Sequence, residues 1–263
     1  QILRRNPFKN IKIRAKGQRS KKREPFSSKQ LQALFSSPVH LDLGYPQRRH
    51  SDYWLDLLML FTGARIGELA YLSVADIDVL DEVYFITISS TYQAKSNWHR
   101  IKIKELAVIG IEKSVKTLAG NRVVPIHSEL IRLGFIEYIN WGNHNHHYLI
   151  FPDLMGVASL KRKNIGTIAS KRFTKRRNII AENCTDEFVD NIHCAHSFRH
   201  TLIQKLLVEA GVTAPIVRQI VGHEGTTFTE VAYTTKASIK VLNDAILKLP
   251  YSKFTNSIKV WSP

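Results

Sequence analysis

The spacing of apolar residues changes its period along this chain of 263 residues, and that change limits the fold more than any other feature. Most segments repeat apolar residues three or four positions apart, as at Trp54, Leu55, Leu58 and Met59, which is typical of helices that cover a core. Only the middle of the chain alternates with a period of two, as strands do. We therefore expect an α+β fold that is mainly α-helical and contains a small antiparallel β-sheet.

The individual elements follow from this pattern and from their end signals. Strands are expected at 83–89, 100–104 and 121–126. Helices are expected after Ser27, after Ser51, and over 128–141, 165–181, 197–210, 214–221 and 237–249. Ser27 and Gln30 match a capping box, and Thr62-Gly63 ends the second helix beside Arg65.

The formal net charge of +16 is concentrated in two blocks. Residues 1–25 hold ten lysines and arginines against one acid, and residues 154–181 hold eight with no acid. One block alone fits a solvated surface, but two favour nucleic acid as a partner over an acidic membrane surface. The candidate DNA-binding residues are Arg19, Lys21, Lys22, Arg23, Lys161, Arg162, Lys163, Lys171, Arg172, Lys175, Arg176 and Arg177.

Other compositional features exclude several classes of protein. No apolar run is long enough to span a membrane, and no signal-peptide pattern opens the chain. Its two cysteines, Cys184 and Cys194, are too few for a disulfide framework and favour a reducing cytosol.

Two groups of residues could be read as metal sites. They are His144, His146 and His147, and then Cys184, His193, Cys194, His196 and His200. The first group lies in a polar turn with no carboxylate or thiol near it, and the second fits no common zinc spacing. We therefore expect no metal site and no cofactor.

Groups suited to phosphate chemistry are concentrated between His196 and Tyr233. His196 and Arg199 are three residues apart on an expected helix and so share one face. The phenol of Tyr233, with an ordinary pKa of about 10, is a better nucleophile near neutrality than serine once cations favour the phenolate. Taken singly, these residues also fit a basic helix face and a packing tyrosine.

A distant arginine completes the set. Arg65 stands beside the expected helix break, where a functional charge is common, although an ion pair with Glu68 explains it equally well. Two guanidinium groups, from Arg65 and Arg199, can clamp the non-bridging oxygens of a phosphoryl transition state.

Five motifs, in this order, resemble those of the catalytic domain of tyrosine recombinases, the phage integrase family. They are T-G-A-R-I-G-E-L (62–69), K-T-L-A-G-N-R-V-V-P-I (116–126), H-S-F-R-H-T (196–201), V-G-H (221–223) and V-A-Y-T (231–234). The resemblance covers about residues 25–240. It implies a catalytic set of Arg65, Lys116, His196, Arg199, His223 and Tyr233.

The resemblance implies a role for each of these residues in site-specific DNA recombination. Tyr233 would attack the scissile phosphate and form a 3′-phosphotyrosyl link, and Lys116 would protonate the leaving 5′-oxygen. His196 would handle the tyrosine proton, while His223 would bind a phosphate oxygen held by the two arginines. For the acid, Lys113 and Lys95 remain alternatives to Lys116.

The family also implies how the chain is organised and what it binds. Residues 1–24 would be a basic interdomain linker that follows an absent core-binding domain, and residues 25–263 the catalytic domain with a C-terminal helix and tail. The partner would be double-stranded DNA, bound as a homotetramer, with a monomer expected without DNA. Accessory DNA-bending proteins, and a cytoplasmic, nucleoid-associated place in a bacterium, are further expectations.

Several alternatives remain open at this point. A non-catalytic DNA-binding protein would use the helix-turn-helix-like segment 202–222. A type IB topoisomerase shares the same chemistry, and a metal-dependent nuclease would need a metal. After Tyr233, an apolar stripe could pack on a neighbouring subunit or close its own core. This stripe comprises Val241, Leu242, Ala245, Ile246 and Leu249.

Overall fold

The computed structural model describes residues 23–42, 44–45, 49–113, 120–155, 164–182, 184, 188–189, 192–223 and 236–262. Its helices are α1 (Ser28–Phe35), α2 (Pro38–Leu41), α3 (His50–Thr62), α4 (Ile66–Ala70), α5 (Asn97–Val108), α6 (Ser128–Arg132), α7 (Phe135–His144), α9 (Ile165–Ala181), α10 (Ser197–Gln204), α11 (Ala214–Val221), α13 (Ile239–Ile246) and α14 (Ser252–Thr255). Short helical turns are η1 (Val74–Asp76), η3 (Pro152–Leu154) and η4 (Lys205–Glu209). The strands are β1 (Ile77–Leu80), β2 (Val83–Ile88) and β3 (Arg122–Pro125).

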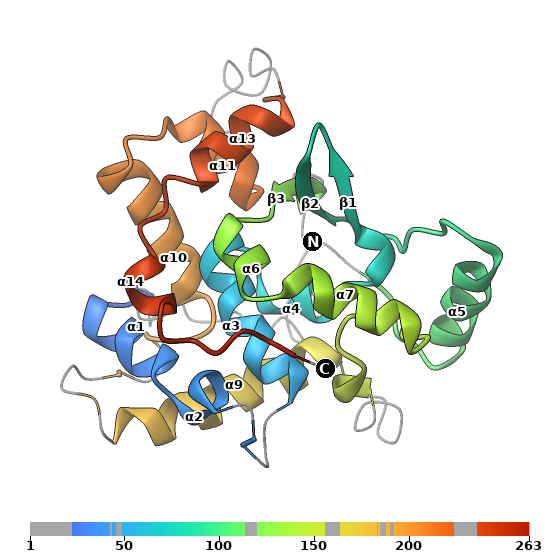
Figure 1. Ribbon diagram of the computed structural model, residues 1–263, viewed down its shortest axis with the longest axis horizontal. Coiled ribbons are helices and arrows are strands. Elements are labelled where there is room, and N and C mark those ends of the chain that lie inside the picture. Colours follow the sequence, from blue (N-terminus) through green and yellow to red (C-terminus); the bar gives the residue numbers. More distant parts are fainter. Residues whose placement is uncertain are drawn as a thin grey trace, which may run out of the picture.

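Helix α3 runs through the middle of the molecule and is buried on every side from Ser51 to Thr62 (Figure 1). Gly63 ends it in the left-handed conformation, with a φ of 61°. A Cβ on Gly63 would lie 3.2 Å from both Leu202 of α10 and Val221 of α11. This close approach gathers the start of α4 and helices α10 and α11 around the end of α3.

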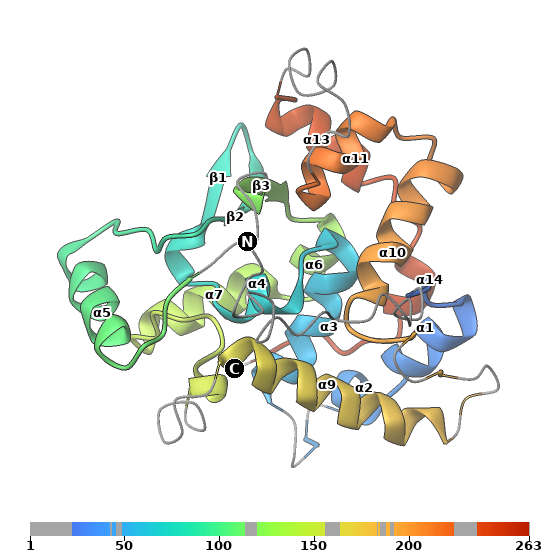
Figure 2. The same ribbon diagram turned by 180° about the vertical axis from the view of Figure 1, so that it is seen from behind.

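The three strands form one antiparallel sheet in the order β1-β2-β3. Ile86 and Ile88 of β2 and Val124 of β3 are buried, whereas Val79 and Leu80 at the β1 edge are about half exposed. Helices α11 and α13 lie against β3, and α9 crosses the opposite side of the molecule beneath α3 and α4 (Figures 1 and 2). The expected fold, mainly helical with a small antiparallel sheet, is confirmed.

Most of the expected elements are present with small changes. The capping box of Ser27 and Gln30 forms, and α9 and α11 begin and end where the periodicity predicts. The helix expected over 128–141 is two helices, because Gly134 has a φ of 92°. A Cβ there would lie 3.0 Å from the backbone oxygen of Trp261, so the C-terminal segment occupies the space beside the break. Strand β1 was not predicted.

The strand expected at 100–104 is wrong, because this segment lies inside helix α5. Ser96 caps the helix by accepting from the backbone N–H of His99 at 3.1 Å. Trp98, Ile103 and Leu106 then share its inner face, at a helical rather than a period-two spacing. Helix α5 lies in the connection between β2 and β3, at the side of the molecule near the end of α7 (Figure 1).

The stripe after Tyr233 packs on the chain's own core. Leu242, Ala245, Ile246 and Leu249 are buried, whereas Val241 is 45% exposed. The following segment returns across the molecule, where the backbone N–H of Trp261 donates to the carbonyl of Leu133. Of the two alternatives, the structure shows the one in which α13 closes its own core. None of the helices in the described part of the chain is both long and apolar enough to cross a membrane.

Candidate active site

Arg65 caps the start of α4 directly beyond the end of α3. Its backbone N–H donates to Glu68 Oε2 at 3.0 Å, and its Nη1 donates to Glu68 Oε1 at 2.6 Å. The side chain of Arg65 stays 28% exposed, whereas that of Glu68 is 4% exposed. The ion pair expected from their i,i+3 spacing is therefore present, and it fixes Arg65 without burying it.

Glu68 also binds a second arginine. Arg122 Nη2 donates to Glu68 Oε2 at 2.8 Å. Burial alone would raise the pKa of Glu68, but the charge and hydrogen bonds of Arg122 and then of Arg65 overcome this and lower it below its ordinary value. Glu68 thus stays ionised between two guanidinium groups.

Arg199 lies on the first turn of α10 and is almost completely buried. Its Nη1 donates to the carbonyl of Gly63 at 2.9 Å, which ties it to the end of α3. Among the described residues, its Nε and Nη2 have no hydrogen-bond partner. Burial, followed by the positive charges of Arg122 and Arg65, lowers the pKa of Arg199 to about 9. A buried cation with open donors is the complement of an anion.

The positive charges of Arg199 and Arg65 act on both predicted histidines, His196 and His223. Burial lowers the pKa of His196 to about 4, with further lowering from His200, Arg23, Arg199 and Arg65. His196 precedes α10, and its ring centroid lies 5.1 Å from that of His200. It is therefore neutral near pH 7.

His223 follows the left-handed Gly222 that ends α11. Burial lowers its pKa to about 4, and the charges of Arg199, Arg65 and Arg122 lower it further in that order. Because Arg65 and Arg199 act on both histidines, these four side chains share one region. We call Arg65, Arg122, His196, Arg199 and His223 the cationic cluster.

Two of the six predicted catalytic residues, Lys116 and Tyr233, lie outside the described residues. Both alternative lysines are already paired within the protein. Lys113 is buried against Asp76, and Lys95 donates to Asp78 Oδ2 at 2.8 Å. Their pairing leaves Lys116 as the stronger candidate.

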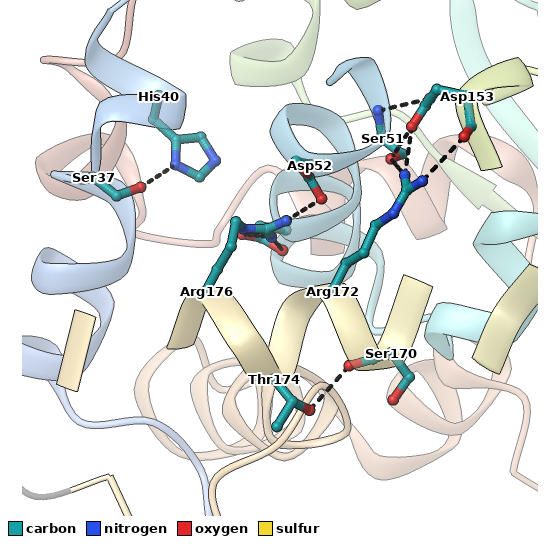
Figure 3. A network of polar contacts seen from close by, with 10 residues as sticks. Ser37, His40, Ser51, Asp52, Asp153, Ser170, Arg172, Thr174 and Arg176 are labelled. Carbon is teal, nitrogen blue, oxygen red and sulfur yellow. Dashed lines mark hydrogen bonds and ion pairs between the residues drawn. The ribbon is translucent and has the colours of Figure 1, made fainter. Parts of the chain in front are cut away.

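The basic block of 154–181 divides into two kinds of residue. Lys171 and Lys175 are exposed on α9. Arg172 donates to Asp153 Oδ2 at 2.8 Å, and Arg176 binds both Asp52 and Asp56, reaching Asp56 Oδ2 at 2.7 Å (Figure 3). These two arginines therefore join α9 to the rest of the protein, which is not the phosphate contact that we expected of them.

Arg177 is also turned inward. It is 2% exposed and donates to the carbonyl of His193 and to Asn178. A pocket of about 200 Å³ beside α9, lined by Arg49, Lys175 and Arg176 among others, shares no residue with the cationic cluster. The basic block therefore contributes to the packing of α9 more than its sequence suggests.

The remaining candidate DNA-binding residues are placed as follows. Arg23 is exposed, and its charge acts on His196. The backbone N–H of Phe26 donates to Thr201 Oγ1 at 2.8 Å, so the chain directly after the basic residues 1–24 lies along α10. Outside the described residues lie Arg19, Lys21, Lys22, Lys161, Arg162 and Lys163.

Neither suggested metal site forms. In the described ranges of the chain, no three histidine, cysteine, aspartate or glutamate side chains are placed to hold an ion together.

The helical fold and its small antiparallel sheet are those of a tyrosine recombinase catalytic domain. The family model described as the phage integrase family matches residues 28–239, and the chain belongs to this family. Its fold is similar to that of the solved integrase from mycobacterium phage Brujita, with a TM-score of 0.52 and 17% sequence identity. That match covers 92% of this chain and 65% of the other. No curated protein sequence matches the chain.

Sequence reasoning missed the part played by Arg122. Arg122 stood out only as one residue of the 116–126 motif, and Glu68 only as the partner of Arg65. A signal was present in both motifs, because each contains a second charged residue besides the expected catalytic one. These residues are Glu68 in 62–69 and Arg122 in 116–126. What was missing was the contact between them, which joins residues 54 positions apart.

Proposed function

We propose that this chain is the catalytic domain of a site-specific recombinase that cleaves and rejoins DNA through a covalent 3′-phosphotyrosyl intermediate. One observation carries the proposal: the buried guanidinium of Arg199 keeps two donors without a partner among the described residues. A buried polar group is normally satisfied, and an exception requires an explanation. A phosphate group that binds both donors would provide one.

The surroundings of Arg199 support a phosphate rather than a carboxylate of the protein. Arg65 and Arg122 lie close enough to lower its pKa, and Glu68 already divides its two oxygens between them. The cluster thus carries more positive than negative charge. A phosphodiester would receive hydrogen bonds from more than one side, and its transition state would be stabilised where charge develops.

The chemical step uses groups of this chain alone. Tyr233 Oη attacks phosphorus, the bond from phosphorus to the 5′-oxygen breaks, and Lys116 gives that oxygen its proton. The tyrosine proton passes to His196, which is neutral near pH 7. Arg65, Arg199 and His223 hold the non-bridging oxygens. A 5′-hydroxyl from a second strand then attacks the phosphotyrosine and reverses the step, so the bond energy is kept.

This proposal fixes the expected partners. The substrate is double-stranded DNA, and exchange between two duplexes requires four active sites, hence a homotetramer on DNA. Residues 25–263 would form the catalytic domain and 1–24 the linker to a core-binding domain. Accessory DNA-bending proteins would shape the sites.

The test is covalent capture. The chain is incubated with a pool of nicked duplexes of random sequence, and adducts that survive denaturant are isolated and sequenced. Wild type should form an adduct through Tyr233, and Tyr233→Phe should form none. Adduct formation should continue in EDTA, which distinguishes the reaction from that of a metal-dependent nuclease. A wild-type chain that binds DNA without forming any adduct would be a DNA-binding protein instead.

A further inference from the structure

Arg122 stands at the first position of β3, and its guanidinium joins three separate parts of the candidate site. Its side chain is 5% exposed. Besides the bond from Nη2 to Glu68, its Nε donates to the carbonyl of Ile220 at 2.8 Å, and its Nη1 donates to the carbonyl of Gly120 at 2.8 Å. Each nitrogen of the guanidinium therefore has its own acceptor.

The first two acceptors, Glu68 and the carbonyl of Ile220, are each connected to a group that we propose to bind phosphate, Arg65 and His223 respectively. Glu68 uses its other oxygen to hold Nη1 of Arg65. Ile220 is in the last turn of α11, three residues before His223. The position of Arg122 is therefore transmitted through one contact to each of these groups.

The third acceptor belongs to the chain just before β3. The carbonyl of Gly120, two residues before Arg122, accepts from Nη1. The start of β3 is thereby held by the same guanidinium as Glu68 and the last turn of α11.

Stability alone does not explain this arrangement. The charge of Arg122 lowers the pKa of Arg199 and of His223, so in the free protein it opposes the charged forms of its neighbours. Buried ion pairs contribute little net stability, and a surplus of buried cations destabilises the fold. Functional sites, in contrast, are held by supporting residues that fix the geometry of the groups in contact with substrate.

We propose that Arg122 is a positioning residue, which holds Arg65 and His223 in register around one phosphate. This inference rests on the proposed recombinase function. Arg122 itself would not touch the DNA, since each of its three guanidinium nitrogens already donates to an acceptor within the protein.

The sharpest variant is Arg122→Lys. It keeps the charge, but one ammonium cannot serve three acceptors in the fixed planar directions of a guanidinium. Misplacing catalytic groups by about 1 Å costs about 100-fold in rate. We therefore expect adduct formation at saturating DNA to slow about 100-fold, while the Kd for the same duplex changes less than about threefold.

Arg176→Lys is the matched control. Arg176 is also an arginine bound to carboxylates, with a side chain only 17% exposed, but it lies on α9 outside the cationic cluster. Both variants are measured below their melting temperatures. Arg176→Lys should cleave at the wild-type rate, so a loss confined to Arg122→Lys separates positioning from a general loss of stability. If Arg122→Lys fails to fold, Glu68→Gln weakens the same contact from the other side and should slow cleavage about tenfold.

Each outcome decides one question. If Arg122→Lys cleaves as fast as wild type, or loses no more than Arg176→Lys, the inference is wrong. If wild type forms no adduct at all, the proposed function fails, and the inference with it.

Discussion

Two arginines of this chain, the partly exposed Arg176 and the buried Arg199, have opposite surroundings. Arg176 on α9 is bound by two carboxylates, Asp52 and Asp56, and their charges raise its pKa against the effect of burial. Arg199 on α10 has one carbonyl partner, and neighbouring cations add to burial in lowering its pKa. Arg176 is therefore paired directly with carboxylates, whereas among the described residues no carboxylate forms a hydrogen bond or ion pair with Arg199.

This difference separates structural from functional positive charge. The network around Arg176 is complete within the protein and connects α9 with α3 (Figure 3). The cationic cluster has unused donors and awaits an anion. A protein gains nothing in stability from such a cluster, and active sites are known to reduce stability in this way. Replacing Arg199 should therefore lower the rate of adduct formation without lowering stability, and replacing Arg176 should lower stability without changing the rate.

The largest effect is expected for Arg199→Met. It removes a donor that the transition state requires, and losses of this kind reach about 10³-fold in rate. Its melting temperature should stay the same or rise, because an apolar side chain of similar size replaces a buried, partly unsatisfied cation. Adduct formation and thermal unfolding measure the two effects. A large fall in stability would show that Arg199 is a structural residue.

Arg176→Met should show the reverse. Breaking a buried pair leaves Asp52 and Asp56 without their cation and costs about 3 kcal/mol of unfolding free energy. The rate of adduct formation per folded molecule should not change. Urea unfolding at pH 7 gives the stability, and the comparison breaks down if cleavage falls along with it.

The pH dependence of stability should also differ between the two regions. The pKa values of His196 and His223 are lowered to about 4, so their contribution is fully present above about pH 6.5 and is lost as pH falls through 4. Burial raises the pKa of Asp56 to about 6, against the effect of Arg176, so its contribution is present below its ordinary value and is lost as pH rises through 6.

Melting temperatures measured from pH 4 to 7 test these signs. Replacing both histidines with glutamine should reduce the loss of stability on acidification. Asp56→Asn should instead reduce the loss that accompanies rising pH. Added sulfate should stabilise wild type more at pH 5 than at pH 7, because an anion favours the protonated histidines. If sulfate acts equally at both values, the histidines do not face the anion site.

The sequence predicted some of these features and not others, and the difference has a physical cause. Arg65 could be placed because Gly63 breaks α3, a local signal that needs no knowledge of the fold. The segment I-K-I-K at 101–104 misled because its alternation is short enough to fit a helix as well as a strand. Arg172 and Arg176 looked like free charges because their carboxylates lie 19 and more than 100 residues away. Long-range pairing of charges has no local signature.

The smallest effects are expected at Lys171 and Lys175, the exposed members of the same basic block. Replacing either with glutamine should change stability by less than about 0.5 kcal/mol, because neither forms an ion pair within the described residues. If α9 contacts DNA, each change should weaken binding at all sequences and lower the slope of log K against log salt by about 1. Arg172→Gln is the control, since its charge is already bound to Asp153. This variant should lower the stability and leave the slope unchanged. If the lysine variants also leave the slope unchanged, α9 does not contact the DNA. The DNA-binding surface would then consist of the cationic cluster and the basic residues 1–24.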